Sequence, residues 1–279
     1  MSRAEDREQP VETIRAQLNY LVDTGEKPVT FSNASAGNKN TDHTGRYEEH
    51  TVTIANGRPH IPEFSLDREG FIFIEHATQM KNFYDEEEIR RVYYPEMEQL
   101  VKDVTGASRV VVFDHTLRAA DEATREDKQV SGPVRRVHND YTEWSGPQRV
   151  RDLLPKEEAE ALLKRRFAVV QVWRPIRNPV EETPLAIADA RSLDAKNLIA
   201  TERRYPDRVG EIYHITYNPD HRWFYFPGMK RTEALVFKCY DSEKDGRARW
   251  TAHAAFEDPT SRPDAPPRES IEIRTLAFF

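Results

Sequence analysis

Apolar and polar residues change their period along the chain, and these changes divide it into strand-like and helix-like parts. Short pieces rich in β-branched and aromatic residues at 51–54 and 71–74 predict an N-terminal β-rich layer. Over residues 85–105, apolar residues recur every three or four positions, which predicts a helix with Asp85 as its N-cap. Pro95 lies inside this run and lacks a backbone N–H, so we expect it to divide or kink the helix.

The rest of the chain has strand-like composition, interrupted by one further helix. Residues 109–115 and 135–141 predict strands, and the charged stretch 119–133 between them is expected to form a mobile loop. A second helix is predicted to begin at Pro155, because proline fits the first turn of a helix. Downstream, many short apolar segments separated by Pro, Asp and Asn predict a β-sandwich or barrel. These segments are 167–173, 185–190, 198–201, 211–217, 223–226, 235–240, 249–254 and 270–279.

The order of these elements predicts a mainly β fold with flanking helices. The first residues are highly polar, so we expect residues 1–20 to form an N-terminal arm. Residues 21–279 are then expected to form a single domain with an N-terminal β layer and two helical segments.

Composition and charge exclude several classes of function. The chain of 279 residues has 41 Lys and Arg against 48 Asp and Glu, a net charge of −7, which does not fit a nucleic-acid binder. Its apolar runs fall far short of the roughly 20 residues of a membrane helix, and its charged start predicts no export signal. The single Cys239 fits a reducing cytosol. We therefore expect a cytoplasmic protein with neither nucleic acid nor membrane as a partner.

The residues that could carry chemistry are His138 and Asp140. The chain has no Gly-rich phosphate loop, GxSxG elbow or HExxH motif. In a strand, residues two apart point to the same face, so this imidazole and this carboxylate could bind one metal ion. A second histidine would complete the two-His, one-carboxylate triad of non-haem Fe(II) oxygenases. The spacing alone has little specificity, because a surface strand can carry the same two residues by chance.

The order of later residues favours the metal site. His253 lies on a later predicted strand and is preferred as the third ligand over His115, His214 and His221. In the last predicted strand, Arg268 and Ser270 share a face and offer a guanidinium and a hydroxyl for the distal carboxylate of a 2-oxo acid. Arg274 shares that face as well, so strand parity does not separate the two arginines. We favour Arg268 because of its hydroxyl neighbour.

At these residues the chain resembles the hydroxylase/desaturase group that includes a fungal gibberellin desaturase and the hydroxylase-like component of cephamycin methoxylation. The resemblance implies a double-stranded β-helix (jelly-roll, cupin-like) core and an oxygenase of secondary metabolism that uses Fe(II), 2-oxoglutarate and O₂. It also implies that His138, Asp140 and His253 bind the metal, and that Arg268 and Ser270 bind 2-oxoglutarate. The matching stretches are 94–96, 112–115, 136–140, 173–175, 238–242, 253–259 and 267–274.

The substrate and the outcome of the reaction stay open at this point. Hydroxylation, desaturation and cyclisation are all compatible with the resemblance, each with release of succinate and CO₂. Arg118 and Arg174 are candidates for binding an acidic substrate, although an ordinary ion pair explains such residues more often. Two alternatives also remain: a cupin-like metalloenzyme with non-oxidative chemistry, and a non-catalytic barrel that binds a small molecule.

Overall fold

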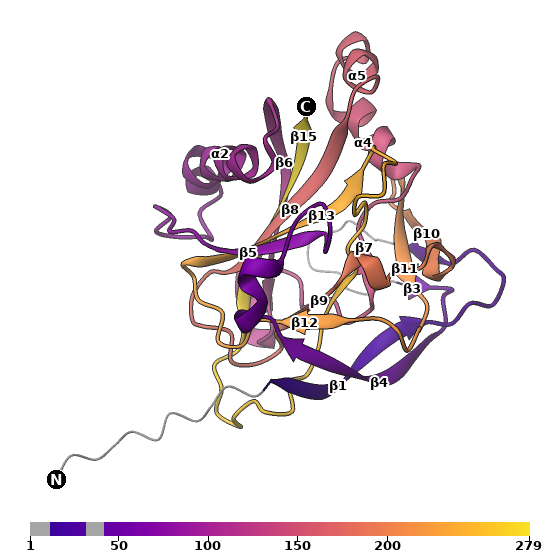
Figure 1. Cartoon of the computed structure of the whole chain (residues 1–279). Helices are drawn as coiled ribbons and strands as arrows, with labels where there is room; N and C mark the ends of the chain where they lie inside the picture. Colours follow the sequence, from indigo (N-terminus) through magenta and orange to yellow (C-terminus); the bar gives the residue numbers. More distant parts are fainter. Residues whose placement is uncertain (1–11, 32–41) are drawn as a thin grey trace.

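Two β-sheets face each other in the structure, a computed structural model that describes residues 12–31 and 42–279 (Figure 1). The smaller sheet has five strands, in the order β5 (Phe71–Glu75), β13 (Glu233–Asp241), β8 (Phe167–Pro175), β15 (Glu269–Phe278) and β6 (Arg109–Ala119). The larger sheet has ten, in the order β1 (Thr13–Leu21), β4 (Tyr47–Asn56), β12 (Trp223–Tyr225), β9 (Leu185–Ala188), β14 (His253–Ala255), β7 (His138–Asn139), β11 (Val209–Ile215), β10 (Leu198–Arg204), β2 (Val29–Phe31) and β3 (Asp42–His43). Most of the strand pairs are antiparallel, and many strands that are neighbours in a sheet lie far apart in the sequence. This arrangement is the predicted jelly-roll core.

The helix predicted over 85–105 is present and is divided as expected. It consists of α1 (Glu86–Glu88), a π-helical turn (Ile89–Tyr93) and α2 (Tyr94–Thr105). The Asp85 carboxylate accepts hydrogen bonds from the backbone N–H groups of Glu87 and Glu88, so it is the N-cap. Pro95 lies in the first turn of α2, where its missing N–H costs nothing. The local signals in the sequence were therefore sufficient for this element.

Three further helices flank the sheets: α3 (Glu122–Lys128), α4 (Ser145–Leu153) and α5 (Lys156–Leu162). The last begins directly after Pro155, as predicted. The predicted loop 119–133 contains α3, whose N-cap Asp121 accepts a hydrogen bond from the N–H of Thr124. The helix α4 was not predicted, because a glycine and a proline in its first turn resemble a turn signal. Three short 3₁₀ helices span Arg58–Glu63, Ala190–Ser192 and Ala195–Asn197.

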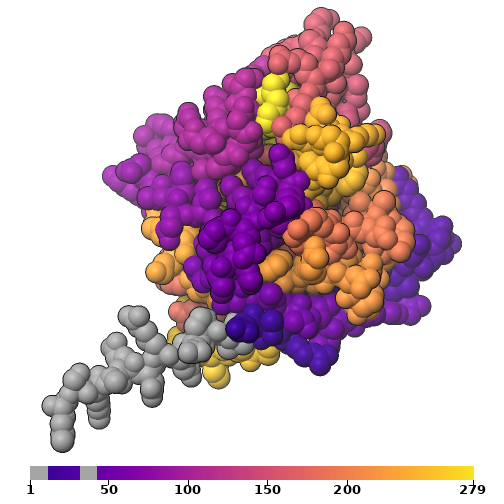
Figure 2. All heavy atoms as spheres, viewed as in Figure 1, coloured from indigo at the N-terminus to yellow at the C-terminus, as the bar shows by residue number. Residues whose placement is uncertain are grey.

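The strand β15 separates two hydrophobic cores because its side chains alternate between two faces. Ile271 and Ile273 point outward and pack in a core that includes Met97 of α2. Leu276 and Phe278 point inward and pack with residues of both sheets. Nearly all of β15 is buried, and Figure 2 shows only a small bright yellow area of the chain's end between neighbouring elements. The even-numbered residues of this strand therefore face the space between the sheets.

The predicted polar arm 1–20 requires correction. Thr13–Leu21 forms β1, which pairs with β4 over nine residues. Apolar side chains alternate along it, and Ile14 and Leu18 pack on Ala186 and Ala254 from the outer face of the larger sheet. This strict alternation of polar and apolar residues is itself the signal of a half-buried strand, and the polar composition of the first residues outweighed it in the prediction. The domain thus begins at β1 or earlier, and residues 1–11 lie outside the described residues.

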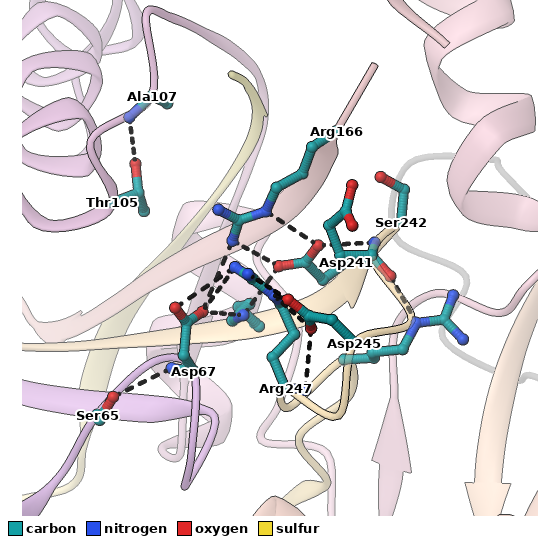
Figure 3. Close-up of polar contacts among 12 residues, drawn as sticks. Ser65, Asp67, Thr105, Ala107, Arg166, Asp241, Ser242, Asp245 and Arg247 are labelled. Atoms are coloured by element: carbon teal, nitrogen blue, oxygen red, sulfur yellow. Dashed lines mark hydrogen bonds and ion pairs between the residues drawn. The ribbon is translucent and has the colours of Figure 1, made fainter. Parts of the chain in front are cut away.

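A network of charges, buried at Lys238 and Asp241 and exposed at Asp67, ties the segment before β5 to β13 on the outer side of the smaller sheet (Figure 3). The Lys238 ammonium donates to Asp67 Oδ1 at 2.7 Å and to Asp241 Oδ2 at 2.9 Å. Arg166 also donates to Asp241 Oδ2, at 2.8 Å, and Arg247 lies beside Asp67. Because each of these charges meets an opposite charge, we assign the network to the stability of the fold.

Within the described ranges, none of the helices combines the length and the apolar character needed to cross a lipid bilayer.

Candidate metal centre

Three donor groups converge between the sheets, at the point where the shortest strands of the larger sheet meet. His138 on β7 pairs directly with His253 on β14, and their ring centroids are 4.3 Å apart. Asp140 follows His138 by two residues, and its Oδ1 lies 3.6 Å from His138 Nε2. One ligand atom from each of the three residues lies within 4.8 Å of the others, and all three side chains are buried. The structure thus brings together the three residues that the sequence singled out.

Backbone carbonyls orient both imidazoles toward the cluster. His138 Nδ1 lies 2.8 Å from the carbonyl oxygen of Arg136, and His253 Nδ1 lies 3.4 Å from that of Thr251. An Nδ1–H that donates to a carbonyl leaves the lone pair on Nε2, which then faces the cluster. Within the described residues, the buried Nε2 of His253 has no hydrogen-bond partner. Such an unpaired buried nitrogen fits a metal ligand.

Two neighbours orient the carboxylate of Asp140. Its Oδ2 accepts hydrogen bonds from Gln171 Nε2 at 2.8 Å and from Arg274 Nε at 3.1 Å, which leaves Oδ1 to face His138. Burial alone would raise the pKa of Asp140, but the cation of Arg274, together with the hydrogen bond from Gln171, outweighs it and holds that pKa well below its usual range. The group is therefore an ionised carboxylate.

The charge state of His138 also suits metal binding. Burial lowers the pKa of His138 well below its usual value, and the nearby His253 lowers it further. A neutral imidazole is the form that binds a metal. Two imidazoles and one carboxylate fit Fe(II), and this triad leaves other positions on the metal open.

The guanidinium of Arg268 is buried with part of its hydrogen-bonding capacity unused. Its Nη1 donates to the carbonyl oxygen of Thr183 at 2.6 Å, and its Cζ lies 5.4 Å from the centre of the Trp173 ring. Within the described chain, Arg268 Nε and the nearby Ser270 Oγ are buried without a partner. Burial and the neighbouring Arg118 lower the pKa of Arg268 to about 9. An anionic ligand would satisfy both the free donors and the poorly compensated charge.

The other candidate for this role, Arg274, is already surrounded by carboxylates. It donates to Asp140 Oδ2, to Asp114 Oδ2 at 3.3 Å, and through Nη2 to Glu272 Oε1. These carboxylates outweigh the effect of burial and raise the pKa of Arg274 well above its usual value. A further carboxylate would meet a charge that is already neutralised. The structure therefore favours Arg268 and Ser270 where strand parity left the choice open.

The two arginines considered for substrate binding lie on opposite faces of the smaller sheet. Arg118 pairs with Ser270 across β6 and β15 and points inward, and its Nη1 donates to the Gly132 carbonyl at 3.0 Å. Arg174 is the neighbour of Ile271 and points outward, where it donates to the carbonyl oxygens of His76 and Arg231. The structure thus brings Arg118 toward the cluster and does not bring Arg174 there. The sequence did not distinguish the two arginines, because it does not show how the residues of β8 align with those of β15.

The three competing histidines also have defined surroundings. His115 lies beside Tyr94 and Glu86, on the far side of β6 from the cluster. His214 pairs with His138 across β11 and β7, but its Nδ1 lies 3.1 Å from Thr201 Oγ1. His221, which follows the turn at Pro219 and Asp220, is buried. None of them joins the group of three that could hold a metal.

Sequence reasoning missed the residues that orient the cluster. Gln171 is a single amide in the apolar strand β8, and a polar residue on an inward position was a usable signal. Thr183 has φ +46°, a left-handed conformation that is uncommon for threonine, and its carbonyl oxygen holds Arg268. No local pattern predicts such a contact, because the two residues are far apart in sequence.

A cavity of about 750 Å³ lies under α3, beside the arginine end of the site. Its wall includes Thr183 and Gly132, whose carbonyl oxygens hold Arg268 and Arg118 from the other side. The cluster residues do not line it. Arg268 and Arg118 do not line it either, and each contacts its wall through one of these carbonyl oxygens.

Comparison with known proteins gives consistent matches over nearly the whole chain. A family described as "Oxidoreductase/YMDC permease-like domain" matches residues 18–278. The chain is 31% identical to the hydroxylase/desaturase efuI of Hormonema carpetanum, over 96% of this chain and 95% of that protein. It is 36% identical to the hydroxylase/desaturase CTB9 of Cercospora beticola, over 84% and 78% of the two chains.

Relatives named for their cofactors match equally well. The chain is 31% identical to the Fe(II)/2-oxoglutarate-dependent dioxygenase nvfI of Aspergillus novofumigatus, over 92% of this chain and 93% of that one. Among solved structures, the iron and α-ketoglutarate-dependent endoperoxidase NvfI superposes with a TM-score of 0.84 and 28% identity. That superposition covers 96% of this chain and 98% of the other.

Proposed function

Because the chain belongs to the hydroxylase/desaturase family of Fe(II)/2-oxoglutarate-dependent oxygenases, we propose that His138, Asp140 and His253 bind its Fe(II). We propose further that Arg268 and Ser270 bind the distal carboxylate of 2-oxoglutarate. The observation that carries both assignments is that three of the buried polar atoms without a partner in the described residues belong to these side chains: His253 Nε2, Arg268 Nε and Ser270 Oγ. Buried polar atoms are rarely left without a partner, and a metal ion at His253 and a carboxylate at Arg268 and Ser270 would pair with these three.

The cofactors supply the oxidising chemistry. When they are bound, O₂ oxidises 2-oxoglutarate to succinate and CO₂, and the substrate loses a hydrogen. The residues of the chain bind and orient: the carbonyl oxygens of Arg136 and Thr251 hold the imidazoles, and Gln171 and Arg274 hold Asp140. The aromatic ring of Phe237 lies 4.9 Å from that of His253 and helps to exclude water from the ligands.

The natural substrate is proposed by its chemical class. We propose a small molecule of secondary metabolism that undergoes hydroxylation, desaturation or cyclisation. The cavity under α3 supports an approach from that side, where Arg125 and Arg135 line the wall and Arg118 contacts the carbonyl oxygen of Gly132. The net charge of −7 supports the absence of a nucleic-acid partner, and the single, buried thiol of Cys239 supports a cytoplasmic location.

Formation of succinate tests this proposal. Purified protein with Fe(II), 2-oxoglutarate and O₂ is expected to release one succinate per CO₂, and Asp140→Ala is expected to abolish that release. His115→Gln is the matched control, because it alters a partly buried histidine outside the cluster. Binding of one metal ion without any decarboxylation would instead favour a cupin-like metalloenzyme with non-oxidative chemistry. A wild-type protein that binds no metal would favour a non-catalytic barrel.

A further inference from the structure

A second buried carboxylate lies at the edge of the metal cluster. Glu272 occupies an inward position of β15 between Ser270 and Arg274 and is 5% exposed. Its Oε2 lies 4.0 Å from His253 Nε2, one of the atoms proposed to bind the metal. A small rotation of this side chain would therefore bring a carboxylate oxygen within reach of the same ion.

The guanidinium of Arg274 holds both nearby carboxylates. Its Nε donates to Asp140 Oδ2 at 3.1 Å, and its Nη2 donates to Glu272 Oε1. Its Nη1 is fixed in turn by Asp114 Oδ2 at 3.3 Å and by Thr116 Oγ1 at 2.9 Å, both on β6. Because a guanidinium is planar and rigid, fixing one nitrogen fixes the direction of the other two.

The number of carboxylate oxygens on the metal decides what else can bind. Asp140 and Glu272 together carry four oxygens that could reach the ion, whereas a two-His, one-carboxylate site keeps positions open by using few protein ligands. A second oxygen from Asp140, or one from Glu272, would take a position that 2-oxoglutarate or O₂ needs. Something must therefore restrain these oxygens.

We propose that Arg274 limits the carboxylate ligands of the metal to one oxygen, Asp140 Oδ1, by holding Asp140 through Oδ2 and Glu272 through Oε1. This inference rests on the proposed metal site. Arg274 is then a positioning residue that touches neither the metal nor 2-oxoglutarate. When Arg274 no longer holds Glu272, that carboxylate takes a position on the metal that 2-oxoglutarate or O₂ needs.

Binding measurements with Co(II), without turnover, test this role in Arg274→Met and in the double variant Arg274→Met/Glu272→Gln. Calorimetry gives the affinities for Co(II) and 2-oxoglutarate, and the Co(II) absorption intensity reports the coordination number. We expect Arg274→Met to keep its Co(II) affinity within about 10-fold of the wild type, because Glu272 can then bind the metal and offset weaker binding by an unrestrained Asp140. We expect its affinity for 2-oxoglutarate to fall by about 10-fold or more. The double variant is expected to regain 2-oxoglutarate affinity to within about 3-fold of the wild type, because Gln171 still holds Asp140 Oδ2, while it binds Co(II) more weakly.

Two further variants keep the test decisive. Arg174→Met removes a buried arginine on the outer face of the same sheet and is expected to leave both affinities unchanged. If Arg274→Met does not fold, Arg274→Lys keeps the charge but has a single donor group, so it is expected to hold one carboxylate and to weaken 2-oxoglutarate binding in the same way. Adding Glu272→Gln to that variant is then expected to restore the binding.

The possible failures are distinguishable. Wild-type 2-oxoglutarate affinity in Arg274→Met or Arg274→Lys overturns the inference. So does a double variant that binds 2-oxoglutarate no better than its parent, because Glu272 is then not the competitor. In both cases a wild type that binds one Co(II) leaves the proposed metal site intact. A wild type that binds no Co(II) overturns the metal site and this inference together.

Discussion

His138 and His253 lie directly opposite each other across β7 and β14, with their ring centroids 4.3 Å apart. The two strands have only two and three residues, so side chains reinforce their register. The backbone N–H of Thr251 donates to Asn139 Oδ1 at 3.2 Å, and Asn139 Nδ2 donates to the Cys239 carbonyl oxygen at 2.9 Å. A slip by one residue would turn one imidazole to the opposite face of the sheet and separate the pair.

Removing one of these imidazoles is expected to abolish tight metal binding. His253→Ala leaves one histidine and one carboxylate, and we expect its affinity for Mn(II) to fall by about 100-fold or more, measured as free Mn(II) by electron paramagnetic resonance. His115→Ala provides the comparison, because it removes a histidine that lies with Tyr94 and Glu86. Equal Mn(II) affinity in His253→Ala and the wild type would remove His253 from the ligand set.

Arg268→Ala is expected to weaken 2-oxoglutarate binding while leaving metal binding intact. A lost charge-assisted pair costs about 1.5–3 kcal/mol, so we expect the Kd for 2-oxoglutarate to rise by about 10- to 100-fold. Ser270→Ala removes a neutral donor and is expected to raise the Kd by less than 10-fold. Calorimetry on the Mn(II)-loaded protein measures both effects. A normal Kd in Arg268→Ala would contradict the assignment of the carboxylate site.

Gly70→Ala is expected to disturb the strand that leads to His253. Gly70 has φ +87°, and a Cβ at this position would overlap with Thr251 Oγ1. Gly106 has a similar φ of +72° but open space around it, so Gly106→Ala reports the backbone strain alone, about 1 kcal/mol. Overpacking adds about 1–3 kcal/mol to the effect at Gly70. Urea unfolding measures this difference, and equal losses in the two variants would show that the contact with Thr251 is unimportant.

The buried His221 is expected to make the protein less stable in acid. Burial lowers its pKa from 6.5 to about 4, so below pH 6.5 the unfolded chain takes up a proton that the folded chain refuses. The free energy of unfolding should therefore fall as pH drops from 6.5 toward 4, by up to ~1.4 kcal/mol per pH unit. His221→Gln should flatten this slope, whereas His60→Gln, at an exposed position, should not. Identical slopes in wild type and His221→Gln, measured by urea unfolding, would refute this.

Local patterns predicted much of the fold, and contacts between distant segments account for what they missed. The inward parity of Arg268, Ser270 and Arg274 followed from the period of a strand, and the structure confirms it. The outward position of Arg174 depends on the register between β8 and β15, which no local pattern contains. The choice between Arg268 and Arg274 depends on which carboxylates surround each. Asp114 reaches Arg274 from β6, and Asp140 reaches it from the segment after β7.

The order of His138, Asp140, His253 and Arg268 along the chain proved more informative than the His-x-Asp spacing. Acidic residues are numerous here, so that spacing arises readily by chance. Gln171 and Glu272 could have been noticed as polar residues at inward positions of apolar strands. Their roles could not, because these depend on hydrogen bonds to Asp140 and Arg274 that form only in the folded chain.

We expect one Fe(II), held by His138, Asp140 and His253, to bind 2-oxoglutarate beside Arg268. Chelation of Fe(II) by a 2-oxo acid produces a visible metal-to-ligand charge-transfer band, so 2-oxoglutarate is added to the Fe(II)-loaded protein without O₂. We predict this band in the wild type, its absence in His253→Ala, and a higher 2-oxoglutarate concentration for half-saturation in Arg268→Ala. A wild type fully loaded with Fe(II) that gives no such band would show that 2-oxoglutarate does not bind this metal.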